Sequence, residues 1–487
     1  MAEQQDSSAD GVREAQKGLP YKWLALIAVA IGTYMGTMDA SIVNISFPTL
    51  SKTFGVDVSV VLWVSVAYLL ASTGLMLTLG RLGDLIGRKK VYILGFVIFT
   101  LGMGLCSLAQ NIGQLIGFRV VQAIGSAMLI AVGNAIVIDA FPGRERGKAL
   151  GIMGGVVSAG FITGPLIGGV LLDAFDWRSI FYIRLPVGVI GITMAWLILK
   201  GESRARTRVS FDLRGAMALF GGLTTLLLLV NQGGKVGWTS PYILILGAAT
   251  VTLLALFVVA ERKAIQPVVD LALFRSRLFA AANASLLLIF VATAAYSFLM
   301  PFYLIQGLGY SSSRAGLLMI TVALTTIVVA PLSGWLSDKI GSRILCSLGM
   351  AVVCLALFLL SGLSIHSTTT EVIPWLIIFG LGSGLFQSPN SSAIMGSVPR
   401  DKLGTGAAMI ATGRQVGMSI GIAVAGAIFT SRQAFHMARL AHEQLSPAAL
   451  RSEALVAGFQ DALLVSVLIC SIGIITSLVR GRYHPMG

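Results

Sequence analysis

Long apolar stretches recur along the chain from about residue 22 to residue 479. Each is close to the ~20 residues that an α-helix needs to cross a bilayer. The stretches run continuously apolar, whereas a transmembrane β-barrel would alternate apolar and polar positions over ~10 residues, so a barrel is excluded. The pattern predicts an all-α polytopic membrane protein with fourteen spans. The expected spans are residues 22–48, 60–79, 90–110, 112–140, 148–173, 179–199, 213–231, 241–261, 279–305, 313–334, 344–363, 372–397, 404–430 and 455–479.

A short charged segment occurs twice, each time at the end of a predicted span. GRLGDLIGRKK (80–90) ends the second span, and GWLSDKIGSR (334–343) ends the tenth. Because this connection recurs, the sequence predicts two homologous six-helix halves, a common architecture of secondary transporters. The identical pairs are Gly80/Gly334, Leu82/Leu336, Asp84/Asp338, Ile86/Ile340 and Gly87/Gly341.

Two predicted spans, 213–231 and 241–261, remain between the halves and are flanked by basic segments. The exterior loop at about 431–455 has apolar residues near helical spacing, which predicts a surface helix against the membrane or the outer vestibule. The expected organisation is a cytoplasmic tail (1–21), an N-terminal six-helix half (22–200), a basic linker with two additional transmembrane helices (201–278), a C-terminal six-helix half (279–480) and a cytoplasmic tail (481–487).

Charge is scarce and unevenly distributed. Only 11% of the residues are charged, against roughly 25% in a soluble protein, and the mean hydropathy is +0.86. If the N-terminus is cytoplasmic, most Lys and Arg fall on cytoplasmic segments, as the positive-inside rule requires. This bias predicts that both termini are cytoplasmic, and it explains the net charge of +14 without nucleic acid as a partner. The four cysteines lie inside predicted spans with no CxxC, so neither a disulfide framework nor a metal site is expected.

Opposite charges lie deep in two predicted spans, Asp39 in the first and Arg119 in the fourth, while Arg414 lies within the thirteenth. A charge at the bilayer centre costs at least ~2.5–3.5 kcal/mol on insertion scales, so it usually faces a cavity or a partner. At ~1.5 Å per residue the two residues have similar depth, which predicts a pair, direct or through water. Burial and a nearby arginine act in opposite directions on a carboxylate. We expect Asp39 to carry an exchanged proton and Arg119 to modulate it; the alternative is a fixed ion pair that only sets helix packing.

Several stretches resemble the major facilitator superfamily, in the order in which its motifs occur. GRLGDLIGRKK is similar to its signature loop, and LIGFRVVQAIGSA (115–127) to the arginine motif of its fourth helix. GFITGPLIGG (160–169) resembles the fifth-helix motif of its antiporters. MDASIVNISFP (38–48) resembles the first-helix motif of its fourteen-span drug:proton antiporter branch. The resemblance covers residues 22 to 479 and implies the major facilitator fold, with two extra central helices and alternating access.

The resemblance implies further roles for named residues. It places Asp39 and Arg119 on a central cavity. It implies that Asp84 pairs with Arg88 and lies near the start of the helix beginning near Gly404, which would latch the outward-facing state; the alternative is a solvated loop. The implied cytoplasmic gate comprises Gly80, Asp84, Gly87, Arg88, Asp338 and Gly341, and the implied antiporter motif comprises Gly160, Gly164, Pro165, Gly168 and Gly169.

Small residues at this spacing allow helices to approach closely, and Pro165 can kink the fifth span. The chain departs from the family pattern at Arg184, where Asn is usual, which adds a cation near the outer end of the sixth span.

A substrate cavity needs apolar and aromatic walls with a few polar groups. For each candidate the alternative is a helix–helix contact, and for Arg414 three roles stay open: binding an anionic group, pairing across the halves, or holding a carbonyl at a kink. The candidates are Tyr34, Asn44, Tyr68, Gln122, Tyr296, Phe386, Gln387, Asn390, Arg414 and Gln415.

Together these features predict a monomeric, proton-coupled antiporter of the plasma membrane, in bacteria the inner membrane. It would export lipophilic or amphipathic small molecules, cationic drugs among them, and so confer multidrug or antibiotic resistance. The alternatives are an exporter of lipids or lipid-like conjugates and a non-transporting membrane sensor of the same fold. No cofactor is expected beyond the proton gradient. GMSIG (417–421) matches a hydrolase nucleophile pattern but lies inside an apolar helix, so no enzyme is predicted.

Overall fold

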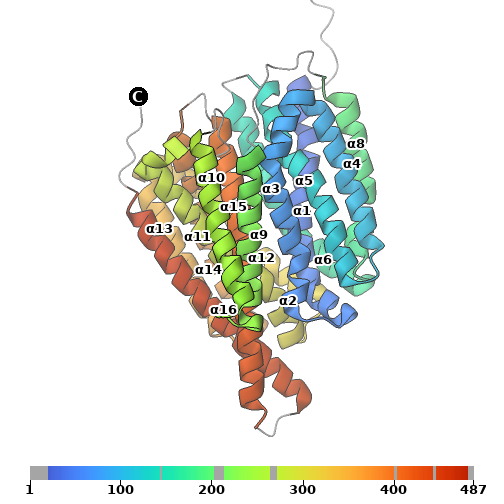
Figure 1. Ribbon diagram of the computed structural model, residues 1–487, viewed down its shortest axis with the longest axis vertical. Helices are drawn as coiled ribbons and strands as arrows, with labels where there is room; N and C mark the ends of the chain where they lie inside the picture. The colour runs from blue at the N-terminus through green and yellow to red at the C-terminus, as the bar shows by residue number, and fades with distance from the viewer. Residues whose placement is uncertain are drawn as a thin grey trace, which may run out of the picture.

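The computed structural model describes residues 20–142, 145–201, 213–263, 271–399, 403–442 and 446–480. These residues form a bundle of long helices, most of which run along the long axis of the molecule (Figure 1). No β-strand occurs in the described ranges. The prediction of an all-α fold is therefore confirmed. The predicted tails, apart from Pro20 and Tyr21, lie outside the described residues.

The first part of the chain supplies helices α1 to α8, and two helices, α9 and α10, follow before the second part. The first eight are α1 (Tyr21–Phe54), α2 (Val58–Val61), α3 (Trp63–Ile86), α4 (Arg88–Ser107), α5 (Ile112–Ala140), α6 (Arg146–Ala174), α7 (Ser179–Tyr182) and α8 (Leu185–Ile198). The next two are α9 (Leu213–Val236) and α10 (Pro241–Lys263).

The second part contains a short 3₁₀ helix, a π-helical turn and six long helices. They are η3 (Leu271–Arg275), α11 (Arg277–Phe302), η4 (Tyr303–Gly307), α12 (Ser312–Ile340), α13 (Ser342–Ser361), α14 (Thr369–Gly396), α15 (Leu403–Leu440) and α16 (Pro447–Leu478). N-cap residues begin two of the long helices: the side chains of Asn111 and Ser311 accept hydrogen bonds from backbone N–H groups in the first turns of α5 and α12.

Twelve helical segments of the described chain are long and apolar enough to cross a membrane. The two predicted spans outside this set correspond to α9 and α15. The described apolar part of α9, Met217–Gly233, is shorter than the rest, and α15 has Arg414 and Gln415 within its apolar stretch. Both helices pack against other long helices of the bundle. A multi-pass membrane protein is thus confirmed, and the count of fourteen crossings stays a prediction.

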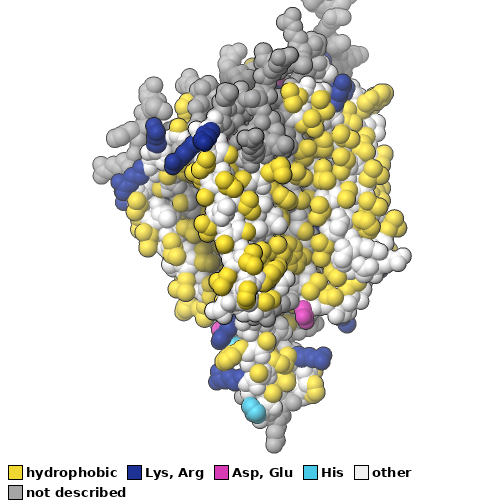
Figure 2. Space-filling view, in the orientation of Figure 1, with side chains coloured by type: hydrophobic (Ala, Val, Ile, Leu, Met, Phe, Trp, Pro, Cys, Tyr) yellow, Lys and Arg dark blue, Asp and Glu magenta, His cyan; other side chains and the backbone are white. Residues whose placement is uncertain are grey.

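The outer surface of the bundle is apolar, as a membrane protein requires. Figure 2 shows hydrophobic side chains over the middle of the visible face, with most Lys and Arg near its two ends. On α10, Leu244, Ile245 and Val251 are 61%, 67% and 71% exposed. Side chains of this kind are stable in that position when lipid covers them.

The two ends of the bundle differ. The start of α1 and the end of α16 lie at one end, which we call the termini end, whereas the last turns of α15 and the first turns of α16 project from the other, the hairpin end (Figure 1). Most of the segment predicted as an exterior loop at about 431–455 is helical, because α15 continues to Leu440 and α16 starts at Pro447. The helical spacing was read correctly and the loop is wrong, whereas the exterior position stays a prediction. The sequence has no Gly or Pro between Gly426 and Pro447 that would end α15 earlier.

Helices from the two parts of the chain meet along two seams. At the α6–α12 seam, α6 packs directly against α12. At the α3–α15 seam, α3 packs against α15, and α9 contacts both of them. Trp63 Nε1 of α3 donates a hydrogen bond to Asn231 Oδ1 of α9 at 3.1 Å, so the contact with α9 includes a specific polar bond.

The repeated signature segments have the same backbone geometry. Gly87 ends α3 with φ 99° and Gly341 ends α12 with φ 85°, a region that favours glycine. Their backbone N–H groups donate to Gly83 O and Ser337 O at 3.0 and 2.9 Å. Both positions thus make the same sharp exit from a helix, in agreement with an internal repeat.

Only some of the residues of the predicted cytoplasmic gate have described side chains. Arg88 forms an ion pair with Asp139 of α5, whereas the resemblance implied Asp84 as its partner. The side chains of Asp84 and Asp338 lie outside the described residues, as do those near Gly404. The latch between the halves therefore stays a prediction.

Candidate functional site

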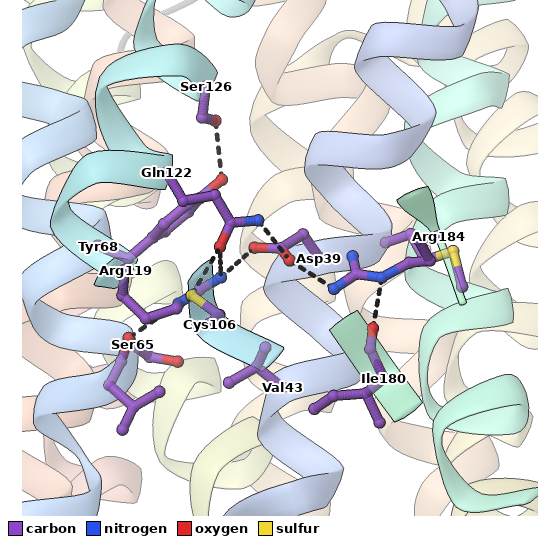
Figure 3. Close-up of polar contacts among 12 residues, drawn as sticks. Asp39, Val43, Ser65, Tyr68, Cys106, Arg119, Gln122, Ser126, Ile180 and Arg184 are labelled. Atoms are coloured by element: carbon purple, nitrogen blue, oxygen red, sulfur yellow. Dashed lines mark hydrogen bonds and ion pairs between the residues drawn. The ribbon is translucent and has the colours of Figure 1, made fainter. Parts of the chain in front are cut away.

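Asp39 lies near the middle of α1 with no exposed surface. Three side-chain groups donate hydrogen bonds to its carboxylate. Arg119 Nη1 donates to Oδ2 at 2.5 Å, Gln122 Nε2 to Oδ1 at 3.0 Å, and Arg184 Nη2 to Oδ1 at 2.8 Å. Figure 3 shows the carboxylate between Arg184 on one side and Arg119 with Gln122 on the other. The pairing expected between Asp39 and Arg119 is direct.

Helix α5 presents two of these donors because Arg119 and Gln122 are three positions apart and therefore share one face. Gln122 Oε1 also accepts from Arg119 Nη1 at 2.7 Å, so the amide bridges the guanidinium and the carboxylate. Arg119 Nε donates to Val64 O at 3.2 Å. The guanidinium lies 4.0 Å from the ring centroid of Tyr68, in cation–π contact.

Arg184 joins the site from the short break between α7 and α8. It is 3% exposed, and its Nε donates to Ile180 O at 2.6 Å, which aims the guanidinium at α1 (Figure 3). From the sequence, Arg184 was expected only as an added cation near the outer end of a span. One signal could have found this role: a buried cation needs an anionic partner, and Asp39 is the one acid deep in the predicted spans.

The network contains more positive charge than negative. One carboxylate faces two guanidinium groups, so the three ionised side chains carry a net charge of +1. Arg119 Nη2 and Arg184 Nη1 are buried without a hydrogen-bond partner in the described structure. Arginine does not lose its proton in proteins. If this arginine–carboxylate network exchanges a proton, the exchanging group is therefore Asp39.

A separate cavity of about 200 Å³ lies between the two parts of the chain. Side chains from α1, α6, α11, α12, α14 and α15 line it. Three of the predicted cavity residues, Tyr296, Gln387 and Arg414, are among them. Ser41 lines the cavity, but Asp39 lies two positions away and therefore on another side of α1.

The cavity does not reach Asp39 or Arg119, both fully buried. The resemblance implied that Asp39 and Arg119 line this central cavity, and in this conformation neither residue does.

The other cavity candidates contact neighbouring helices. Tyr34 Oη bonds to Thr163 Oγ1 at 2.8 Å, Asn44 Nδ2 donates to Ser297 Oγ at 2.8 Å, and Tyr68 Oη donates to Ser126 Oγ at 2.8 Å. Gln415 Oε1 accepts from Thr73 Oγ1 at 2.7 Å, and Asn390 Oδ1 accepts from Arg480 Nη2 at 2.5 Å. Phe386 is fully buried. In this conformation these side chains serve helix packing, the alternative considered for each.

The predicted antiporter motif packs α6 tightly against two helices. A Cβ atom on Gly160 would lie 2.0 Å from Thr37 Oγ1, and one on Gly164 would lie 1.9 Å from Ser41 Oγ, both on α1. Gly168 meets α1 in the same way. Gly169 instead faces α12, where a Cβ atom would lie 2.4 Å from Ser312 O. Glycine is therefore required on both sides of α6.

The α6–α12 seam is closed at the hairpin end. Asp173 accepts hydrogen bonds from the backbone N–H groups of Ser312 and Ser313 at 3.0 and 2.7 Å. A Cβ atom on Gly316 would lie 2.1 Å from Pro165 O, so the two backbones nearly touch. Farther toward the termini end, Cβ atoms on Gly151, Gly154 and Gly155 of α6 would meet nothing within 4 Å.

A family model described as the Major Facilitator Superfamily matches residues 29–422. The chain belongs to the major facilitator superfamily. The match includes Asp39, Arg119 and Arg184, together with most of the cavity lining. The resemblance read from the motifs is thereby confirmed at the level of the superfamily.

Relatives with similar sequences are named as a riboflavin transporter and as a multidrug resistance protein. The riboflavin transporter RibZ of Clostridioides difficile (strain 630) is 36% identical over 458 residues, which cover 94% of this chain and 97% of RibZ. The multidrug resistance protein Stp of Mycobacterium tuberculosis (strain CDC 1551 / Oshkosh) is 33% identical over 411 residues, which cover 84% of this chain and 76% of Stp.

A solved structure supports the major facilitator fold. A bacterial homologue of the human lysosomal transporter Spinster, crystallised in an inward-facing and unoccupied conformation, superimposes with a TM-score of 0.67. The alignment covers 96% of this chain and 100% of that protein at 16% sequence identity. The major facilitator fold expected from the sequence is confirmed. The family and its named relatives are transporters, which is consistent with the expectation that this protein is not an enzyme.

Proposed function

We propose that the protein is a proton-coupled antiporter of the bacterial inner membrane that exports amphipathic small molecules by alternating access. One observation carries the proposal: a buried carboxylate, Asp39, is held by donors from two other parts of the first half, Arg119 and Arg184. Movement of α5 or α8 relative to α1 changes how many cations face the carboxylate. Such a change alters its tendency to take up a proton, which couples proton binding to conformation.

The proposed topology places the termini end in the cytoplasm and assigns the chain to the fourteen-span drug:proton antiporter branch. The conformation described here is then closed toward the exterior, where Asp173 binds the start of α12. In the opposite conformation a proton enters from outside and the exported molecule leaves. No cofactor takes part in this cycle, and a single chain contains the cavity and the carboxylate.

Transport in proteoliposomes tests the proposal. Purified protein is reconstituted with an imposed pH gradient and screened with a panel of amphipathic compounds. We expect substrate flux against its concentration gradient, accompanied by proton movement reported by a pH-sensitive dye. Ligand binding with no gradient-dependent flux would instead identify a sensor. Flux of phospholipid analogues but not of soluble compounds would identify a lipid exporter.

Riboflavin transport is a second candidate because a relative of that name aligns over 94% of this chain. The same proteoliposomes distinguish it. Riboflavin flux that a pH gradient does not accelerate would favour that function over proton-coupled export.

Replacing Arg184 with Asn tests the role of the second cation. Asp39 keeps its bonds to Arg119 and Gln122, but one of two opposite charges is lost. An opposite charge within ~4–6 Å favours an ionised carboxylate. Without it, proton-driven flux should persist to higher external pH, by roughly one pH unit or more. The measurement is the pH profile of flux in proteoliposomes.

The control for this variant is Arg178→Asn in the connection just before α7. The Arg178 side chain is 38% exposed and pairs with Asp176 on the surface. Its loss should leave the pH profile unchanged. An Arg184→Asn profile identical to that of the unmodified protein would show that Arg184 has only a packing role.

A further inference from the structure

The cavity between the two parts of the chain has an uneven charge. Among the described residues that line it, Arg414 of α15 is the one Lys, Arg, His, Asp or Glu. Its Nε is buried without a hydrogen-bond partner, and its guanidinium lies 5.6 Å from the ring centroid of Phe290, also in the lining. The adjacent Gln415 bonds to α3 instead. Arg414 therefore presents an uncompensated positive charge to the cavity.

A second polar group in the cavity also lacks a partner. Tyr296 Oη of α11 is buried without a hydrogen bond, while its ring packs against Phe379 with centroids 4.5 Å apart. Buried polar groups in native proteins are nearly always hydrogen-bonded. Two unpaired groups at one cavity are expected where a ligand supplies the missing partner. Phe161, Phe290 and Phe379 provide aromatic walls for its apolar part.

A cationic substrate would need an acidic side chain in the cavity, and no described lining residue is acidic. The sequence-based expectation of cationic drugs relied on Asp39, but this carboxylate is fully buried and already bonded by two arginines. The Asp39 network adds a net charge of +1 beside the cavity, which shares Met418 with a small gap next to Arg119. A cation in the cavity would therefore be repelled from both directions.

We propose that the cavity selects aromatic organic anions, with Arg414 as the contact for the anionic group and Tyr296 as a second donor. The proposal rests on the proposed function as an exporter and specifies its substrate class. Charge-assisted hydrogen bonds between a guanidinium and a carboxylate are roughly twice as strong as neutral ones. The fused-ring body of such a ligand fills the space between the aromatic walls.

Three naphthalene derivatives of nearly equal shape test the charge preference: 2-naphthoate, 2-naphthamide and 2-naphthylmethylammonium. Their binding to the full chain in lipid nanodiscs is measured by naphthalene fluorescence and calorimetry, with no gradient present. We expect 2-naphthoate to bind at least tenfold more tightly than 2-naphthamide, and the ammonium compound to bind most weakly. Equal or tighter binding of the cation overturns the proposal, as does failure of 2-naphthoate to bind more tightly than 2-naphthamide.

Variants then assign the preference to residues. Arg414→Gln should remove the tenfold preference for 2-naphthoate, Arg414→Lys should retain part of it, and Tyr296→Phe should weaken binding of both the anion and the amide. The control is Arg314→Gln at the start of α12, outside the cavity, which should bind as the unmodified protein does. An unchanged preference in both Arg414 variants overturns the assignment; if Arg414→Gln does not fold, Arg414→Lys and Tyr296→Phe decide it.

These outcomes are separable from a failure of the proposed function. Anion-selective binding without proton-driven flux would leave the inference intact and contradict the antiporter. Proton-driven export with a preference for cations would do the reverse.

Discussion

Replacing Asp39 with Asn is expected to reduce proton-driven flux in proteoliposomes by at least 100-fold. Asparagine keeps an oxygen that can accept from Arg119 or Arg184, but it cannot take up and release a proton. The variant should also be less stable, because both arginines lose the one acidic partner that they have among the described residues. Removing one member of a buried ion pair costs about 3–5 kcal/mol. Flux and thermal stability are measured on the same purified protein.

The double variant Asp39→Asn/Arg184→Asn separates these two effects. Its network carries a charge of +1 from Arg119 alone, the same net charge as in the unmodified protein. We therefore expect most of the lost thermal stability to return, while proton-driven flux stays absent. Counterflow, which needs no proton gradient, should survive in the double variant. Full gradient-driven activity in either variant would exclude Asp39 as the proton carrier.

Gly316→Ala is expected to open the hairpin end. The new Cβ atom would lie 2.1 Å from Pro165 O, a backbone atom that cannot rotate away, so α12 and α6 must separate. Overpacking of this kind costs about 1–3 kcal/mol, which shifts a two-state equilibrium by about 5- to 150-fold. Spin labels at Thr53→Cys and His366→Cys, both exposed at this end, should report a longer distance, and flux should fall.

The matched control is Gly164→Ala on the same helix. Its Cβ atom would lie 1.9 Å from Ser41 Oγ and 2.9 Å from Ile42 N of α1, within the first half. This variant should lose thermal stability without a change in the distance between the labels. The same label distance in Gly316→Ala and the unmodified protein would contradict the role of this contact in closing the transporter.

The sequence was sufficient for the fold and for half of the Asp39 site. Apolar stretches and the repeated signature segment predicted the helical bundle and its internal symmetry. Counting residues from the span ends placed Asp39 and Arg119 at the same depth, and the structure has them in direct contact. Depth is readable from sequence because a helix rises by a fixed ~1.5 Å per residue.

The need of a buried cation for an anionic partner pointed to Asp39 as the partner of Arg184, but counting residues along the span could not place Arg184 beside it. Linear counting treats residues 179–199 as one straight helix, whereas the chain forms a four-residue helix, α7, and a separate α8. The break between them turns Arg184 toward α1. Which face a helix presents to a neighbour depends on tertiary packing, and the apolar residues around Arg184 show no one-sided pattern that would reveal it.

At the hairpin end and around the cavity, too, the sequence identified helices and polar residues but not which neighbours they pack against. The helical spacing in 431–455 was read correctly, but spacing does not say whether a helix lies flat or continues α15 away from the bundle. Likewise, polar residues such as Asn44 and Gln415 were recognised at membrane depth. Their bonds to Ser297 and Thr73 depend on which helices are neighbours.

Helix α9 makes the two sides of the transporter unequal. It contacts both α3 and α15, and the Phe220 side chain fills the space beside Gly74 of α3. A molecule dissolved in the bilayer that approached the cavity along this side would have to displace α9. Among the described residues, no helix covers the α6–α12 side in this way toward the termini end, where Cβ atoms on glycines of α6 would meet nothing within 4 Å. A molecule entering from the leaflet at the termini end would therefore meet less obstruction along the α6–α12 side than along the α3–α15 side.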